Sequence, residues 1–250
     1  KKVDIIIIGA GVTGLSTGYH LSKLGPYQVA CFHSTKNVSE SAGTPGMICG
    51  GLMDNYSRLV HHYGEPRSSQ VWAFAHESFE YLTSFLSLHK IPYHRHKKLR
   101  LITSSEEYNE AKSAVYAMAN QGFRSTLDLR QMSNNQDKNN KHIVAIQNDG
   151  DCGGFVSANK LLEFLRGNSR CSYQKAMISK CEPWQGGWKV TSSKGDVFSC
   201  QVVVLACHQQ IGSLVSSLAP VLVPYADQWI EVKYKRKGSS SVPSWFSPGL

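Results

Sequence analysis

The sequence predicts an α/β fold in which a parallel-sheet domain is interleaved along the chain with an α+β domain. Near the N-terminus, an apolar run over residues 3–8 leads into Gly9-Ala10-Gly11-Val12-Thr13-Gly14 and then into a helical pattern over 12–24. Strand-like runs return late in the chain, after a helical stretch at 69–89. At 250 residues, the chain is long enough for one large domain or two intertwined ones.

Residues 3–33 predict a strand, a glycine turn, a helix and a second strand, which together form a βαβ unit. In the turn, Gly9 permits a tight bend, Gly11 lets the backbone approach a pyrophosphate, and Gly14 allows the helix to pack closely on the strand. The N–H groups at the start of the helix favour an anion. This context predicts a Rossmann-like dinucleotide site, with a glycine-rich turn that holds no ligand as the alternative.

His33 ends the second strand of this unit, where a dinucleotide-binding domain normally carries an acidic residue for the ribose hydroxyls. A neutral imidazole offers one hydrogen bond and lacks the two oxygens of a carboxylate. Two interpretations stay open, namely altered ribose recognition and a surface histidine without a role.

The later elements are predicted from periodicity, caps and breakers. Up to residue 141, the sequence predicts a loop at 34–51, a helix at 69–89, a strand at 99–103, a helix capped by Ser104 that runs to 121, and an exposed loop at 130–141. After residue 141, it predicts an extended segment at 142–146, a helix capped by Ser157 that runs to 166, and strands at 176–178, 187–192 and 197–205, the last buried on both faces.

Composition indicates a folded protein, with 41% hydrophobic and 10% aromatic residues. The formal net charge of +9 permits an anionic partner such as nucleic acid or a phosphate-rich cofactor. No apolar run is long enough to predict a membrane span, and no signal peptide is readable. Because the chain begins at Lys1 rather than Met, an organelle transit peptide stays open.

The seven cysteines are odd in number and have no Cys-x-x-Cys spacing, which argues against a disulfide framework. We therefore expect a reducing compartment, either the cytoplasm or an organelle matrix. Cys31 and Cys200 lie in apolar runs and are predicted to fill the core. His94 and His96 have no further suitably spaced ligands, so no metal site is predicted.

Five segments, taken in order, carry a resemblance to a known family. They are "IIIIGAGVTGLSTGYHLSKLG", "SESAGTPGMICGGL", "KLRLITSSEE", "GGFVSANKLLEFLRG" and "VVVLACHQQI". Over nearly the whole chain the sequence resembles the D-amino-acid oxidase family of FAD-dependent oxidoreductases, which includes glycine oxidase, sarcosine oxidase and the oxidase domain of a tRNA-modifying enzyme. The resemblance implies a Rossmann-like FAD-binding domain at 1–68 and 150–223, and a substrate-type domain at 69–149 and 224–250.

The resemblance also implies FAD as cofactor and assigns residues to it. The residues Gly9, Ala10, Gly11, Val12, Thr13 and Gly14 hold the pyrophosphate, Gly43, Thr44, Met47 and Ile48 line the flavin side, Ile178 lies on the strand that meets adenine, and Ala206 and Cys207 lie where a late strand passes the cofactor. The implied reaction oxidises a C–N bond of an amino acid, an N-substituted glycine or a glycine-like group on tRNA. No catalytic residue is assigned. Tyr225 and Gln228 are the nearest candidates, and the interpretation as ordinary sheet residues is favoured over a catalytic role.

The sequence departs from the family pattern close to the implied cofactor. His33 replaces a carboxylate, Thr44-Pro45 replaces an Arg-Asn pair, and glycines are replaced by His208 and Asp227. In addition, the family's C-terminal portion continues beyond the point at which this sequence stops. We therefore expect either a piece of a longer protein or a chain that lacks part of its flavin enclosure. The alternative function is a catalytically degenerate subunit or assembly factor in a larger complex. An NAD(P)-dependent enzyme is a third reading, but it leaves the flavin-side loop without a purpose.

Two basic segments, 89–100 and 233–237, raise the question of RNA binding. Cations beside aromatic and histidine side chains suit RNA phosphates and a stacked base. The other interpretation is a solvated basic face.

Overall fold

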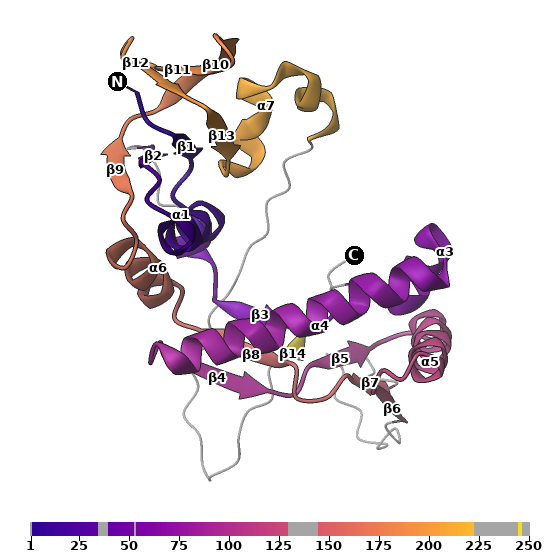
Figure 1. Cartoon of the computed structure of the whole chain (residues 1–250). Helices are drawn as coiled ribbons and strands as arrows, with labels where there is room; N and C mark the ends of the chain where they lie inside the picture. Colours follow the sequence, from indigo (N-terminus) through magenta and orange to yellow (C-terminus); the bar gives the residue numbers. More distant parts are fainter. Residues whose placement is uncertain (1, 35–39, 53, 130–144, 223–244, 247–250) are drawn as a thin grey trace, which may run out of the picture. The chain divides into compact units, whose positions relative to one another are not determined.

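The computed structural model describes residues 2–34, 40–52, 54–129, 145–222 and 245–246. The chain divides into two compact units, Lys1–Pro45 with Ser157–Val232 and Gly46–Val156 with Lys233–Leu250 (Figure 1). This division differs from the boundaries expected from the sequence, because residues 46–68 and 150–156 group with the second unit. The role of each unit, cofactor-binding or substrate-type, stays a prediction.

The first unit is built on a parallel sheet. Its βαβ unit consists of β1 (Ile5–Ile8), α1 (Val12–Leu24) and β2 (Val29–His33), as the sequence predicts. With β9 (Ser172–Lys175) and β13 (Val202–Leu205), the strand order is β13-β1-β2-β9. All four isoleucines of β1 are buried. Central strands of a parallel sheet are covered on both faces, which explains this uninterrupted apolar run.

A second sheet of the first unit is antiparallel, with β10 (Ile178–Trp184), β11 (Gly187–Ser192) and β12 (Val197–Cys200) in that order. It shares one core with the parallel sheet, in which the rings of Phe32 and Phe198 lie 4.7 Å apart. The helix α6 (Ala158–Gly167) packs against α1 (Figure 1). The remaining elements of this unit are short: α2 (Glu40–Gly43), η1 (His208–Gln210), α7 (Ile211–Leu214) and η2 (Ser216–Val221).

The second unit contains two sheets, with strand orders β14-β5-β7-β6 and β3-β8-β4. The aromatic rings of Tyr56 and Trp72 meet edge to face in its core, at 5.4 Å. Its helices are α3 (Tyr56–Tyr63), α4 (Glu65–Leu88) and α5 (Ser105–Asn120), and its strands are β3 (Met47–Cys49), β4 (Tyr93–His96), β5 (Leu99–Ile102), β6 (Thr126–Leu129), β7 (Ala145–Asn148), β8 (Gly153–Val156) and β14 (Trp245–Phe246).

The cap of α5 confirms a prediction in atomic detail. Ser104 Oγ accepts a hydrogen bond from the Glu107 backbone N–H at 3.1 Å. The Glu107 carboxylate reaches back to the backbone N–H of Thr103 at 2.8 Å. The two side chains therefore accept from backbone donors at the start of the helix. The arrangement differs from a standard capping box in that the carboxylate bonds the N–H of Thr103 and not that of the cap residue Ser104. Ser157 also stands at the N-cap of α6, but its side chain makes no capping hydrogen bond.

Three predictions about secondary structure are wrong. Of the strand expected at 176–178, only Ile178 lies in a strand, because β9 ends at Lys175 and β10 begins at Ile178. The segment 34–51, expected to be a loop, contains α2 and β3. The expected single strand at 197–205 is two strands, with β12 pairing β11 and β13 pairing β1. Because the chain changes sheets at Gln201, Val202 remains 49% exposed and the run is not buried on both faces. The predicted loop at 130–141, and residues 142–144, lie outside the described residues.

Two further expectations concern the state of the cysteines and the absence of a membrane-spanning helix. Every cysteine is described and free, and Cys31 and Cys200 are buried in the core as predicted. Burial raises the pKa of the Cys31 thiol to about 12. In the part of the chain that the structure describes, none of the helices has the length and apolar character needed to span a membrane.

Candidate dinucleotide-binding site

The glycine turn after β1 lies between the carboxyl ends of the two neighbouring strands, β2 and β13. Gly9 has φ of +115°, and its N–H donates to the carbonyl of Phe32 at 2.9 Å. A Cβ built on Gly9 would lie 2.2 Å from the carbonyl oxygen of Ala206, and one built on Gly14 would lie 1.8 Å from the carbonyl oxygen of Gly9. These two glycines are therefore required by the backbone itself, whether or not a ligand is bound.

Gly11 differs from its two neighbours in the motif. Its φ of −76° and ψ of −175° form an extended conformation that any residue adopts. Among the described residues, a Cβ at this position would meet the side chain of Ser41 and no other group, with Oγ at 3.0 Å. In the part of the chain that the structure describes, neither backbone strain nor main-chain packing explains a glycine here. In Rossmann-type turns, the glycine at this position lets the backbone approach a pyrophosphate closely.

The start of α1 has the chemistry of an anion site. The first N–H groups of a helix have no partner within the helix and carry the positive end of its dipole. In α1, the Val12 N–H donates to Ser41 Oγ at 3.0 Å, and no acidic residue occupies the first turn. Both Val12 and Thr13 are exposed. The sequence analysis missed Ser41, which reaches this point from α2, 29 positions further along the chain.

His33 is the last residue of β2, and it pairs in register with Lys175 of β9. Its ring is partly buried, and Nδ1 lies 3.3 Å from the carbonyl oxygen of Ser34. The side chain thus stands at the carboxyl end of the strand, which is where a Rossmann-type unit places its ribose-binding carboxylate.

The predicted flavin-side segment is divided between the two units. Gly43 ends α2 in the first unit, and Thr44 follows it. Met47 and Ile48 belong to β3 in the second unit, opposite Phe155 and Gly154 of β8. Their joint role at one cofactor stays a prediction.

The residues after β13 lie beside the glycine turn. The Ala206 N–H donates to the carbonyl of Ile8 at 2.8 Å, which continues the strand pairing. Cys207 is partly buried, and burial raises the pKa of its thiol. His208 has φ of +51°, a left-handed conformation that side-chain-bearing residues rarely adopt. The position at which the family pattern has glycine is thus one where glycine is the favoured residue.

Ile178 begins β10 and is buried in the core that the two sheets of the first unit share. Its side chain therefore packs rather than lines an open site. The backbone around it is irregular, with a register shift between Ile178 and Lys180. The catalytic candidates Tyr225 and Gln228, together with Asp227 and the basic segment 233–237, lie outside the described residues.

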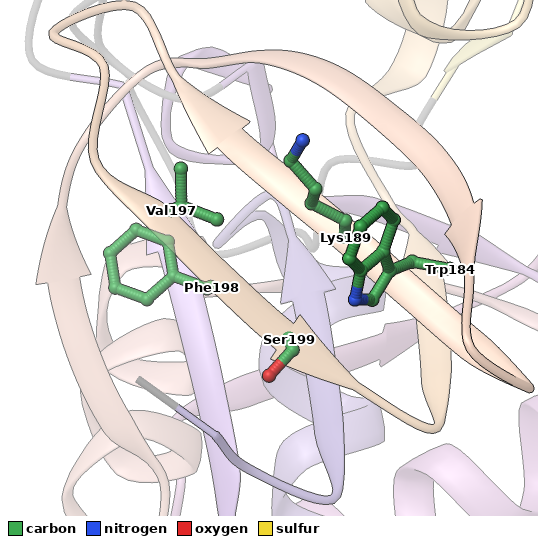
Figure 2. Close-up of a pocket in the computed structure, with 5 residues that line it drawn as sticks. All are labelled: Trp184, Lys189, Val197, Phe198 and Ser199. Carbon is green, nitrogen blue, oxygen red and sulfur yellow. The ribbon is translucent and has the colours of Figure 1, made fainter.

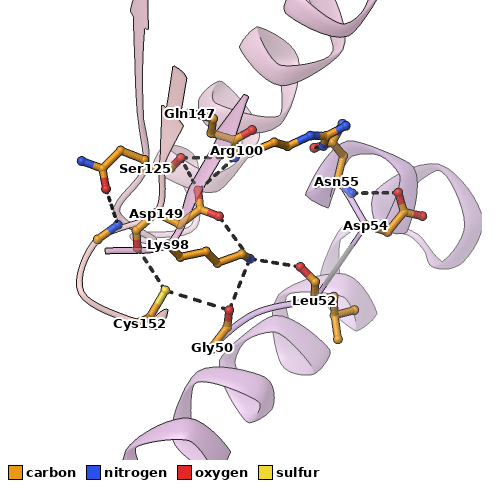
Figure 3. Close-up of polar contacts among 12 residues, drawn as sticks. Gly50, Leu52, Asp54, Asn55, Lys98, Arg100, Ser125, Gln147, Asp149 and Cys152 are labelled. Carbon is orange, nitrogen blue, oxygen red and sulfur yellow. Dashed lines mark hydrogen bonds and ion pairs between the residues drawn. The ribbon is translucent and has the colours of Figure 1, made fainter. Parts of the chain in front are cut away.

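The basic segment 89–100 is largely engaged within the second unit. Arg95 forms an ion pair with Glu80, with one N–O distance of 3.0 Å. Lys98 Nζ lies 3.2 Å from Asp149 Oδ2, and the Arg100 guanidinium donates to Asn55 Oδ1 (Figure 3). Three of the cations expected to face solvent or RNA therefore have internal partners.

No metal site emerges where the sequence analysis weighed one. His94 and His96 have ring centroids 6.4 Å apart on β4. Among the described residues, no group of three or more His, Cys, Asp or Glu side chains is arranged to hold a metal ion.

A shallow hollow on the antiparallel sheet of the first unit is separate from the predicted site residues. Trp184, Lys189, Val197, Phe198 and Ser199 line it (Figure 2). Lys189 Nζ lies 5.3 Å from the centroid of the Trp184 ring, a cation–π contact. None of these residues belongs to the glycine turn, so the hollow adds nothing to the candidate dinucleotide site.

Comparison with known proteins gives one family match and several similar solved structures. A family model described as FAD dependent oxidoreductase matches residues 4–248. Among solved structures, glycine oxidase from Geobacillus kaustophilus superposes with a TM-score of 0.68 at 16% identity, covering 86% of this chain and 58% of that one. Glycine oxidase from Bacillus cereus superposes with a TM-score of 0.62 at 18% identity, covering 86% of this chain and 58% of that one. Iminodiacetate oxidase from Chelativorans superposes with a TM-score of 0.60 at 16% identity, covering 86% of this chain and 57% of that one.

The chain thus spans a little more than half the length of these solved structures. No curated protein sequence matches it. At these identities the structural likeness concerns the fold.

Proposed function

The chain belongs to the family of FAD-dependent oxidoreductases, and we propose that it binds FAD at the start of α1 and takes part in oxidising a C–N bond. The substrate class of the proposal is an amino acid or an N-substituted glycine. The single observation that carries it is the contrast within the glycine motif, because Gly11 lacks the packing reason that Gly9 and Gly14 have.

The phosphate end of the site fits the cofactor. The helix start offers N–H groups, the adjacent Ser41 hydroxyl and no carboxylate in the first turn. Within the described part of the chain, a diphosphate approaching Gly11 would displace no main-chain atom, since the one close neighbour of its missing Cβ there is the Ser41 side chain. Helix dipole and hydrogen bonding then act together on the negative charge.

The residues at the expected ribose position fit FAD less completely than those at the phosphate position do. His33 stands at the strand end, where its imidazole gives or takes one hydrogen bond at a time. We infer a weaker grip on the adenosine ribose than a carboxylate provides. The His208 side chain, on a left-handed residue beside the turn, replaces a glycine of the family pattern.

In the proposed reaction the isoalloxazine of bound FAD would supply the hydride acceptor. The described part of the chain would contribute cofactor binding, with its helix start, Ser41 and His33 fixing the phosphate and ribose. The comparisons with glycine oxidases and iminodiacetate oxidase support small amino acids as substrates. A glycine-like group on tRNA is less favoured, because Lys98 and Arg100 are engaged internally and Arg95 is paired with Glu80.

A second candidate function is a catalytically degenerate subunit of a larger complex. The observation that favours it is the cluster of departures at the cofactor, namely His33 in place of a carboxylate and His208 at φ of +51°. Such a subunit would keep the fold without turning over an amine.

A visible absorption spectrum of the full-length protein, purified and then mixed with FAD, separates the two functions. The proposal predicts flavin bands at one FAD per chain that are bleached without oxygen by glycine, sarcosine or iminodiacetate. Bound flavin that none of the three amines bleaches would contradict the proposed substrate class. A protein that acquires no flavin band would overturn the proposal and favour the degenerate subunit.

A further inference from the structure

A small cavity of about 20 Å³ lies within the second unit. Its polar lining comes from separate elements, with Trp72 on α4, Arg100 on β5 and Gln147 on β7. A cavity needs roughly 10–15 Å³ of volume open to the centre of a water-sized sphere to hold one water molecule. The space is therefore large enough for one small occupant and too small for a substrate or cofactor.

Four buried polar atoms of the lining residues have no hydrogen-bond partner among the residues that the structure describes. They are Nδ2 of Asn55, the indole nitrogen Nε1 of Trp72, Nε of Arg100 and Oε1 of Gln147. Trp72 is 1% exposed and Gln147 is 4% exposed. Arg100 and Gln147 are partners in the register of β5 and β7, so their side chains leave the same face of the sheet. Buried polar atoms left without partners are rare in native proteins and call for an occupant.

The orientation of the Gln147 amide is fixed by its neighbour. Gln147 Nε2 donates to Asp149 Oδ1 at 2.9 Å (Figure 3). The same carboxylate accepts from Ser125 Oγ at 2.7 Å and pairs with Lys98 at 3.2 Å. Because an ionised carboxylate only accepts hydrogen bonds, the amide nitrogen must face Asp149. Oε1 is therefore the atom that Gln147 has left for the cavity.

The chemistry of the four atoms selects the class of occupant. Asn55 Nδ2, Trp72 Nε1 and Arg100 Nε are donors, so the occupant must accept hydrogen bonds, which excludes a cation. Gln147 Oε1 is an acceptor, so the occupant must also donate, which excludes a halide or a fully ionised oxyanion. A water molecule does both and fits the volume, and its two lone pairs accept from two of the donors, for which the strand residue Arg100 and the helix residue Trp72 are the pair that the proposal assigns. We propose that one ordered water occupies this cavity and joins α4 to the β5 and β7 strands.

A crystal structure of the full chain, grown with bromide in place of chloride, tests the occupant directly. The proposal predicts one ordered water within hydrogen-bond distance of Trp72 Nε1, Arg100 Nε and Gln147 Oε1. An anomalous bromide peak in the cavity, an empty cavity, or side chains that bond each other directly would each overturn it.

A double-mutant cycle in solution tests the bridge without a crystal. Trp72→Phe removes the indole donor and Gln147→Met removes the amide acceptor. With a shared water, the change in the unfolding equilibrium constant of the double variant should differ from the product of the single changes by roughly threefold or more. The control cycle pairs Trp72→Phe with Ser125→Ala, which touches Asp149 and not the cavity, and it should be multiplicative within about twofold. Multiplicative behaviour in both cycles would contradict the bridge.

Discussion

Lys98 Nζ lies 3.2 Å from Asp149 Oδ2, with only 13% and 6% of the two side chains exposed. Lys98 also donates to the carbonyl oxygens of Gly50 and Leu52 (Figure 3). Its ammonium lies 5.2 Å from the centroid of the Trp72 ring. Both charges of this buried pair are therefore compensated on several sides. The pair joins the segment after β3 to the ends of β5 and β7.

Removing the cation should destabilise the second unit strongly. Lys98→Met leaves the Asp149 carboxylate buried without its counter-ion, and breaking a buried pair in this way costs about 3–5 kcal/mol of unfolding free energy. The matched control is Glu80→Gln, which breaks the exposed pair with Arg95 and should cost about 0–1 kcal/mol. Urea unfolding measures both. Equal effects of the two substitutions would show that the Lys98–Asp149 pair is not the anchor described above.

The stability of the second unit should also depend on pH through His76. Burial, followed by the nearby positive charge of Lys98, lowers the pKa of this histidine. The unfolded chain, with a histidine pKa of about 6.5, then binds more protons than the folded chain. Stability is therefore fully present above about pH 6.5 and falls as the pH drops toward the lower folded pKa.

Urea midpoints measured between about pH 5.5 and 7.5 test this dependence. The midpoint of the unsubstituted chain should fall toward pH 5.5, and the slope should flatten in His76→Gln. An identical slope in the variant would show that another group is responsible.

His208→Gly should stabilise the first unit. The residue has φ of +51°, and the left-handed conformation costs a side-chain-bearing residue about 1 kcal/mol relative to glycine. His208→Ala removes the imidazole but keeps the strained conformation, so it separates the two effects. Thermal unfolding of both variants gives the comparison. A lower melting temperature for His208→Gly would show that contacts of the imidazole outweigh the backbone strain.

The sequence predicted the βαβ unit because its signals are local. The strand run, the glycines and the helix stop all lie within residues 3–33. It could not reveal Ser41, whose hydroxyl meets the Val12 N–H only after α2 has folded against the helix start. Likewise, the single apolar run at 197–205 gave no sign that the chain changes sheets at Gln201.

The basic segment shows the same limit. A run of cations in sequence suggests a charged surface, but the partners of Arg95, Lys98 and Arg100 come from positions 15 to 51 residues away. Charge pairing at that separation is a property of the tertiary fold. The division of the flavin-side loop at Pro45 was unpredictable for the same reason, since the pairing of β3 with β8 decides it.

The affinity of the full-length protein for FAD, compared with that of Gly11→Val, tests the central claim most directly. Gly11 is extended and, among the described residues, the Ser41 side chain is the one close neighbour of its missing Cβ. The substitution should therefore destabilise the fold by no more than the loss of the hydrogen bond between the Val12 N–H and Ser41 Oγ, about 0.5–1.5 kcal/mol. A side chain here would occupy the path of the pyrophosphate. We predict one FAD per chain for the unsubstituted protein and an affinity lower by at least about tenfold, or 1.4 kcal/mol, for the variant. Equal affinity in the two proteins, or no binding in either, would contradict a pyrophosphate site at the start of α1.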